Sequence, residues 1–269
     1  MTTAPRPTLD ELRRALAEGE GEGVKVAVID SGVDVTHPFL QELGLTLDDD
    51  LAIEDDGLTL KVAEDTKLDV FGHGTAVSWV VRKVAPKARI GSVRVLGTNN
   101  TARDAGICEG VKVAVERGYR VLNCSFGSRS VAKLAMYKDW VDMAYLKGIH
   151  IVAACNNDYY NLTEWPGHFP SVITVNMARS PDELDKFYYK PGALVEFASR
   201  GCNVKLPWKD GRVLEQTGSS FAAPRVAGLV ARMLSAYPDL SPLEVKSALH
   251  RLALPWVKEV AASNVSYSI

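Results

Sequence analysis

The stretch that decides the fold is Val24-Lys25-Val26-Ala27-Val28-Ile29-Asp30-Ser31-Gly32. Residues 24–29 are mostly apolar and β-branched, which is typical of a strand buried on both faces of a parallel sheet. Asp30 follows the last apolar residue, and Ser31-Gly32 favours a turn directly after it. The segment therefore predicts a central strand with a carboxylate at its carboxyl end, where sites form in open α/β sheets.

Similar apolar runs follow along the chain, with helical patterns between them. Strands are predicted over residues 90–96, 121–124, 149–154 and 172–176, and helices over residues 9–17, 75–84, 104–117 and 134–147. Strands that alternate with helices at this spacing predict right-handed βαβ units and a doubly wound, mostly parallel sheet. We therefore predict an α/β three-layer sandwich that forms a single domain over residues 24–269, after a short N-terminal segment, residues 1–23. In that segment Thr8 and Glu11 form a capping-box pattern.

Two further segments carry the residue types of a nucleophilic site. Gly218-Ser219-Ser220-Phe221-Ala222-Ala223-Pro224 has a serine at the start of an apolar helix, where unpaired N–H groups favour an oxyanion. Gly72-His73-Gly74-Thr75 supplies a base, which Asp30 can orient. Alone, each residue has a simpler reading, as a turn aspartate, a structural histidine and a helix cap. Together, in the chain order Asp30, His73, Ser220, they predict a catalytic triad.

These segments, with two that lie between them, resemble the sequence blocks of the subtilisin-like serine proteases (subtilases). Leu122-Asn123-Cys124-Ser125-Phe126-Gly127 resembles the family's substrate-binding strand, and Val152-Ala153-Ala154-Cys155-Asn156 resembles the strand that ends in its oxyanion asparagine. The resemblance covers roughly residues 20–252. It implies the subtilisin-like fold and a serine endopeptidase that works through an acyl-enzyme. The catalytic residues that it implies are Asp30, His73, Ser220 and Asn156.

The resemblance also implies where a peptide substrate binds. Ser125, Phe126 and Gly127 are expected to offer an open strand edge to an extended peptide. Gly127 alone would also explain an ordinary exit from strand to loop. Residues 96–100, which include Gly97, resemble a second edge strand on the other side of the peptide.

The pocket for the residue before the cut is expected to be acidic. Trp165-Pro166-Gly167 matches a turn of the family, so Glu164 falls at the pocket floor, with Asp158 at the rim. Carboxylates there would favour lysine or arginine, whereas a slipped alignment would leave Glu164 in solvent. Cys155 follows Ala154 where the family usually has glycine, so its side chain is expected to press on the pocket wall.

Composition excludes several other classes of protein. The 269 residues carry a net charge of −2 and no basic run, which argues against nucleic-acid binding. No stretch has the ~18 consecutive apolar residues of a membrane-spanning helix. The four cysteines stand singly, without the spacing of a zinc site or redox pair, and most lie in apolar contexts typical of buried thiols. The sequence therefore predicts a peptide or protein as partner, and it indicates no oligomeric state.

No metal or cofactor is implied by these patterns. Two acidic clusters, residues 48–50 and 54–56, are compatible with calcium, but neither has EF-hand spacing. Acidic clusters of this kind are usually solvated hairpin tips, which is what we expect here. Calcium therefore stays possible but is not implied.

The leading prediction is a cytoplasmic serine endopeptidase, because the N-terminus has no apolar signal region and the cysteines are not arranged as pairs. A compact protease inside a cell must avoid indiscriminate damage, so we expect a dedicated substrate that is matured or activated by the cut. Two alternatives stay open at this point. One is a peptide ligase or macrocyclase that uses the same acyl-enzyme, and the other is a catalytically silent peptide-binding module.

Overall fold

The apolar run that begins at Val24 forms strand β1 (Lys25–Asp30), which lies well inside the sheet. In the computed structural model, which describes residues 6–64 and 68–257, β1 pairs in parallel with β4 (Arg89–Arg94) and β5 (Val121–Cys124). Its last five residues are buried. The run is therefore covered on both faces of the sheet, as its composition predicts.

Ten strands of the described residues form the sheet, in the order β12-β8-β9-β7-β6-β5-β1-β4-β2-β3. Neighbouring strands are parallel except for the pairs β2–β3 and β8–β9. The doubly wound, mostly parallel sheet is thus confirmed. The remaining strands are β2 (Leu47–Asp55), β3 (Leu60–Glu64), β6 (His150–Ala154), β7 (Ile173–Ala178), β8 (Phe187–Tyr189), β9 (Phe197–Arg200) and β12 (Leu254–Pro255).

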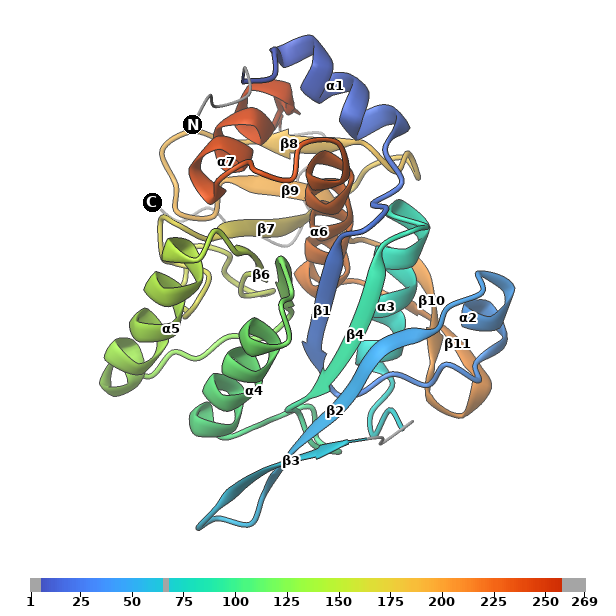
Figure 1. Cartoon of the computed structure of the whole chain (residues 1–269), viewed down its shortest axis with the longest axis vertical. Helices are drawn as coiled ribbons and strands as arrows, with labels where there is room; N and C mark the ends of the chain where they lie inside the picture. Colours follow the sequence, from blue (N-terminus) through green and yellow to red (C-terminus); the bar gives the residue numbers. More distant parts are fainter. Residues whose placement is uncertain (1–5, 65–67, 258–269) are drawn as a thin grey trace.

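Helices cover both faces of the sheet and complete the three layers (Figure 1). Alternate residues of β1 enter different cores: Val26 and Val28 pack with α1, α3, α6 and α7, whereas Ala27 and Ile29 pack with α4 and α5. This alternation follows from the two-residue period of a strand. The helices are α1 (Leu9–Glu18), α3 (His73–Val84), α4 (Asp104–Glu116), α5 (Leu134–Leu146), α6 (Ser219–Ala236) and α7 (Pro242–Leu252).

A short helix and a two-stranded hairpin of the described residues lie outside the main layers. The short helix α2 (Pro38–Glu42) follows β1, and β10 (Val204–Trp208) pairs in antiparallel fashion with β11 (Arg212–Gln216). Side chains of β10 pack against α3 around Ala76 and Val80. This hairpin therefore covers the outer side of the helix that begins at His73. No helix in the described residues is both long and apolar enough to cross a membrane.

The N-terminal helix α1 packs onto the domain rather than standing apart from it. Its capping box is formed, with Thr8 and Glu11 hydrogen-bonded to each other's backbone N–H groups. Leu12 and Leu16 are buried in the core that α6 and α7 share. The guanidinium of Arg232 in α6 donates to Leu16 O at 2.7 Å and to Val84 O at 2.5 Å. One side chain therefore joins the carboxyl ends of α1 and α3.

Helices α3 and α6 cross at very short range. A Cβ atom added to Gly228 of α6 would lie 2.6 Å from Cβ of Val84 in α3. Only glycine allows this approach, since real Cβ atoms do not come so close to one another. The crossing fixes α3, which begins at His73, beside α6, which carries Ser220.

The first acidic cluster is not a solvated hairpin tip, so that expectation was wrong. Asp48, Asp49 and Asp50 lie within β2. Asp48 forms an ion pair with Lys25 at 2.7 Å, and Asp49 accepts a hydrogen bond from Tyr119 Oη at 2.7 Å. Paired carboxylates tolerate partial burial. Residues 54–56 do lie at the end of the β2–β3 hairpin, which extends from the domain in Figure 1.

Candidate active site

Asp30 and His73 form a buried acid–base pair. Asp30 ends β1 and His73 begins α3, and the two side chains are 1% and 6% exposed. Nδ1 of His73 lies 2.8 Å and 3.0 Å from the two Asp30 carboxylate oxygens. Burial alone would lower the pKa of His73, but the charge and hydrogen bond of Asp30 and the charge of Asp69 outweigh it, so this pKa is raised above 6.5. Asp30 can therefore orient the imidazole of His73 and stabilise its protonated form.

Asp69, which the sequence analysis did not single out, organises the loop that leads to His73. Its side chain is 5% exposed overall and accepts hydrogen bonds from the N–H groups of Phe71, Gly72 and Thr75. The hydroxyls of Ser31 and Thr75 also donate to it. Gly72 has a φ of 110°, a conformation that favours glycine. One buried carboxylate thus ties the turn after β1 to the start of α3.

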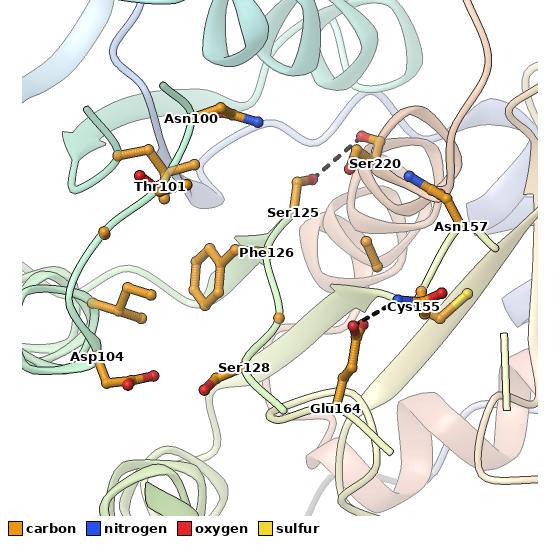
Figure 2. A pocket seen from close by; sticks show the side chains of 16 residues that line it. Asn100, Thr101, Asp104, Ser125, Phe126, Ser128, Cys155, Asn157, Glu164 and Ser220 are labelled. Carbon is orange, nitrogen blue, oxygen red and sulfur yellow. Dashed lines mark hydrogen bonds between the residues drawn. The ribbon is translucent and has the colours of Figure 1, made fainter. Parts of the chain in front are cut away.

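Ser220 lies at the start of α6, beside a hollow of about 410 Å³ (Figure 2). The ring of Phe221, the next residue, lies 5.4 Å from the ring of His73. This contact brings the start of α6 to the start of α3. The Ser220 hydroxyl and His73 are not hydrogen-bonded to each other in the described residues, which is common for a catalytic pair before substrate binds. The hydroxyl of Ser125 donates to Ser220 O at 3.3 Å.

Asn157 presents its side-chain amide to the same place. Its Oδ1 accepts hydrogen bonds from Ser219 N at 2.8 Å and Ser219 Oγ at 2.9 Å. Because the N–H of Ser219 can only donate, this contact fixes the orientation of the amide. The Nδ2 group then faces away from Ser219, and Figure 2 shows it turned toward Ser220. The single proton of the Ser219 hydroxyl is shared between Asn157 Oδ1 and Cys155 O, which lies 2.6 Å from the hydroxyl oxygen, so the loop after β6 is held against the start of α6.

Asn156 does not have the environment of the oxyanion donor that was predicted for it. Its Nδ2 donates to Glu164 Oε1 at 2.8 Å, and its Oδ1 accepts from the N–H groups of Asp158 and Tyr159. Both ends of the amide are therefore used inside the loop. The prediction was one residue short, because two adjacent asparagines follow β6 and only the second reaches the start of α6.

Because Asn157 is the residue whose amide faces Ser220, the residue directly before it is Asn156. The prediction that Cys155 occupies this position was therefore wrong. Cys155 borders the hollow, but its thiol is directed to Asn176 Oδ1 at 3.4 Å and packs with Tyr160. Burial raises the pKa of the Cys155 thiol well above its ordinary value. The side chain that enters the pocket wall is that of Asn156, which contacts Glu164 there.

Two further residues lie elsewhere than predicted. Asp158 is exposed and is not among the residues that line the hollow. Residues 96–100 do not form an edge strand, because Gly97 N donates to Thr101 O and Asn100 N to Gly97 O, which close a turn. Gly97 lines a neighbouring hollow of about 280 Å³ instead.

The other predicted substrate-binding residues line the hollow together. They are Ser125, Phe126, Gly127, Ala154 and Glu164. Phe126 and Gly127 have no backbone hydrogen bond to any other described residue, so they offer an open edge. Ser128 and Trp165 exchange two backbone hydrogen bonds, at 2.8 and 2.9 Å, which hold Glu164 next to this edge. The Glu164 side chain is half-buried and lines the hollow, into which Figure 2 shows it pointing.

Comparisons with known proteins place this chain among proteins of one family. The model of the subtilase family, Peptidase_S8, matches residues 21–266. Subtilisin DY from Bacillus licheniformis is 30% identical over 247 residues, which cover 87% of this chain and 85% of that protein. Subtilisin Savinase from Lederbergia lenta is 28% identical, with 87% and 84% covered. The solved structure of the S41 psychrophilic protease shares the fold, with a TM-score of 0.72 at 24% identity, covering 87% of this chain and 83% of that one.

Proposed function

The chain belongs to the subtilase family of serine proteases, and on that premise we propose that it is an endopeptidase that cuts a dedicated peptide or protein substrate after lysine or arginine. The observation that carries the proposal is the buried Asp30–His73 pair, whose imidazole contacts the start of α6, where Ser220 borders the hollow. The preference for a basic residue rests on Glu164 in the same hollow.

In the proposed reaction Ser220 Oγ attacks the scissile carbonyl and His73 takes its proton. Asp30 holds Nδ1 of His73 and stabilises the imidazolium, which returns the proton to the leaving amine. Water then attacks the acyl-enzyme while His73 takes its proton, and His73 returns that proton to Ser220 Oγ as the carboxylic acid product leaves. Among the described residues, Nε2 of His73 has no hydrogen-bond partner, because Asp30 contacts only Nδ1. Nε2 is therefore available to accept the serine proton.

Asn157 is proposed as the side-chain donor to the oxyanion, together with the backbone N–H of Ser220. The hydrogen bonds from Ser219 fix the Asn157 amide before substrate arrives, so little reorganisation is needed when charge develops. The N-terminus of α6 adds a partial positive charge at the same place.

Glu164 is proposed to select lysine or arginine at the residue before the cut. Asn156 donates to Oε1, so this oxygen is already satisfied. Oε2 lies 2.9 Å from the place where a Cβ on Gly127 would be, so it reaches the edge along which the peptide binds. A basic side chain that enters beside Gly127 would meet a partly buried carboxylate, which gives a charge-assisted hydrogen bond.

Cleavage of a diverse peptide library by the wild type and by Ser220→Ala tests the proposal. We expect cuts by the wild type alone, mostly after lysine or arginine. The summed mass of the two products of each cut should exceed the mass of the peptide by one water. Products joined without added water would indicate a ligase. If neither protein cuts and a fluorophosphonate fails to label Ser220, the protease proposal is wrong and a peptide-binding module is the better description.

A further inference from the structure

The hollow beside Ser220 is lined by two carboxylates at different places. Glu164 lies nearer to Ser220 and Asn157 than Asp104 does, and Phe126 and Ser128 lie between the two acids in Figure 2. The described residues that line the hollow include no lysine, arginine or histidine. Two like charges in one partly enclosed space raise the local negative potential, and a cation that binds there relieves it.

Asp104 keeps one carboxylate oxygen available toward the hollow. It is the first residue of α4, and its Oδ1 accepts a hydrogen bond from Tyr137 Oη at 2.9 Å. Its Oδ2 has no hydrogen-bond partner among the described residues. The nearest basic residue in the chain, Arg103, is turned away from it and bonds Asp55 Oδ2 at 2.5 Å and Gly57 O at 3.0 Å. Asp104 is therefore held in place without being neutralised.

An acid in the first turn of a helix has a simpler explanation, since it stabilises the partial positive charge of the helix N-terminus. That explanation does not account for the position of Asp104 in the hollow that Ser220 borders. Nor does it require the hydrogen bond that Tyr137, from α5, uses to hold the carboxylate there. The two explanations differ in what they predict for substrate choice.

A peptide that adds to the open edge at Phe126 and Gly127 runs extended, with a rise of about 3.3 Å per residue. Its scissile carbonyl lies at Ser220, so the residue before the cut is the one beside Glu164. Residues farther upstream then pass toward the end of the hollow where Asp104 lies (Figure 2). Asp104 is thus placed to meet a side chain two or more residues before the one at the cut.

We propose that Asp104 is a second specificity determinant and that the substrate carries two basic residues, one at the cut and one upstream that Asp104 binds. This inference rests on the proposed function. It adds a substrate class, a peptide with paired but separated positive charges, that recognition by Glu164 alone does not require.

The experiment uses peptides with lysine or arginine fixed at the cut and every upstream position randomised. The enzymes are the wild type, Asp104→Asn, Asp104→Glu, Glu164→Gln and Glu109→Gln. Glu109 is a matched control, because it lies on α4 like Asp104 but lines a different hollow. The read-out is the ratio of kcat/KM for peptides with a basic or a neutral residue at each upstream position.

We expect the wild type to prefer a basic upstream residue, and Asp104→Asn to reduce that preference by about tenfold while the preference at the cut stays. Asp104→Glu should restore it, and Glu109→Gln should behave as the wild type. Glu164→Gln should instead weaken selection at the cut and keep the upstream preference. A merely helix-stabilising Asp104 would change none of these ratios.

Binding of the same peptides to Ser220→Ala and to the double variant with Asp104→Asn gives a second read-out that needs no turnover. A dissociation constant about tenfold higher for the double variant supports the inference. A wild type without upstream preference, or an Asp104→Asn variant that keeps it, overturns the inference and leaves the protease proposal intact. Failure of the wild type to cut and of Ser220 to be labelled overturns the proposed function itself.

Discussion

At the scale of single residues, the site depends on side chains that do not meet the substrate themselves but form hydrogen bonds to the residues or loops that would. Asp69 accepts from three backbone N–H groups and two hydroxyls, and thereby shapes the loop before His73. Ser219 uses its N–H and hydroxyl to orient Asn157. Such groups fix the geometry of the site before the reaction begins, so that transition-state charge meets dipoles already in place.

The assignment of the oxyanion donor to Asn157 rather than to Asn156 can be tested by removing each side-chain amide. Asn157→Ala should reduce kcat by about 10²–10³ with little change in KM, which is the loss known for such a donor in a subtilisin. Asn156→Ala should leave kcat within about threefold of the wild type, because its amide bonds Glu164 and not the start of α6. Steady-state kinetics on one peptide measures both. Equal losses of kcat in the two variants would contradict the assignment.

The pH dependence of activity should report His73. The catalytic base must be neutral in the free enzyme, so kcat/KM should rise with pH as His73 loses its proton. Since Asp30 and Asp69 raise the pKa of His73 despite burial, the midpoint of this acidic limb should lie above 6.5. The substrate should be a peptide with arginine before the cut and blocked ends, because the charge of arginine does not change over this pH range. A midpoint at or below 6.5 would show that burial dominates.

Part of the residue-scale picture could be predicted from the sequence. Asp30, His73 and Ser220 follow from motif and order, and the geometry brings Asp30 and His73 into direct contact. Asn157 could not be chosen over Asn156, because adjacent residues of one type differ only in where their side chains point. Asp69 gives no signal either, since its partners are mostly backbone groups that any sequence possesses.

At the scale of elements, the strands and helices around the site follow the apolar patterns closely. β5 occupies Val121–Cys124 as predicted, and α4 begins at Asp104. β2 was not predicted, because its acidic first half has the pattern of an exposed loop. Ion pairs of Asp48 with Lys25 and Arg89 neutralise its charge and allow this acidic segment to pair as a strand. Short strands such as β8, with three residues, are set by tertiary pairing and leave little pattern in the sequence.

The link between α1 and α6 should contribute measurably to stability. Arg232→Ala leaves the carbonyl groups of Leu16 and Val84 without their donor in a buried place, and should lower the free energy of unfolding by about 3 kcal/mol. Arg14→Ala, on the exposed side of α1, is the control and should change it by less than about 0.5 kcal/mol. Urea unfolding measures both. Indistinguishable midpoints would mean that water replaces the guanidinium at no cost.

At the scale of the whole molecule, acid should destabilise the fold through His150. Its side chain lies at the start of β6 and is 1% exposed, and burial together with the charge of Arg120 lowers its pKa from 6.5 to about 4. The unfolded chain therefore binds a proton between these values while the folded chain does not. The stabilisation is complete above pH 6.5 and is lost as the pH falls through 4.

This group alone should reduce the free energy of unfolding by about 3 kcal/mol between pH 7 and pH 4. His150→Gln should flatten that part of the stability profile. His250→Gln, which removes an exposed histidine, should leave its slope unchanged. Denaturant unfolding at a series of pH values gives both slopes. If the two variants have the same profile, folding does not lower the pKa of His150.

The crossing of α3 and α6 at Gly228 has a consequence for how the enzyme can adapt. The base and the nucleophile belong to different helices, and the contact of Gly228 with Val84 sets the spacing of those helices. A looser contact would give the pair more freedom and would also open a gap in the interior, whereas a larger residue would push the helices apart. The mobility of the catalytic residues and the thermal stability of the fold therefore depend on the same helix–helix contact. Selection on either property acts on both.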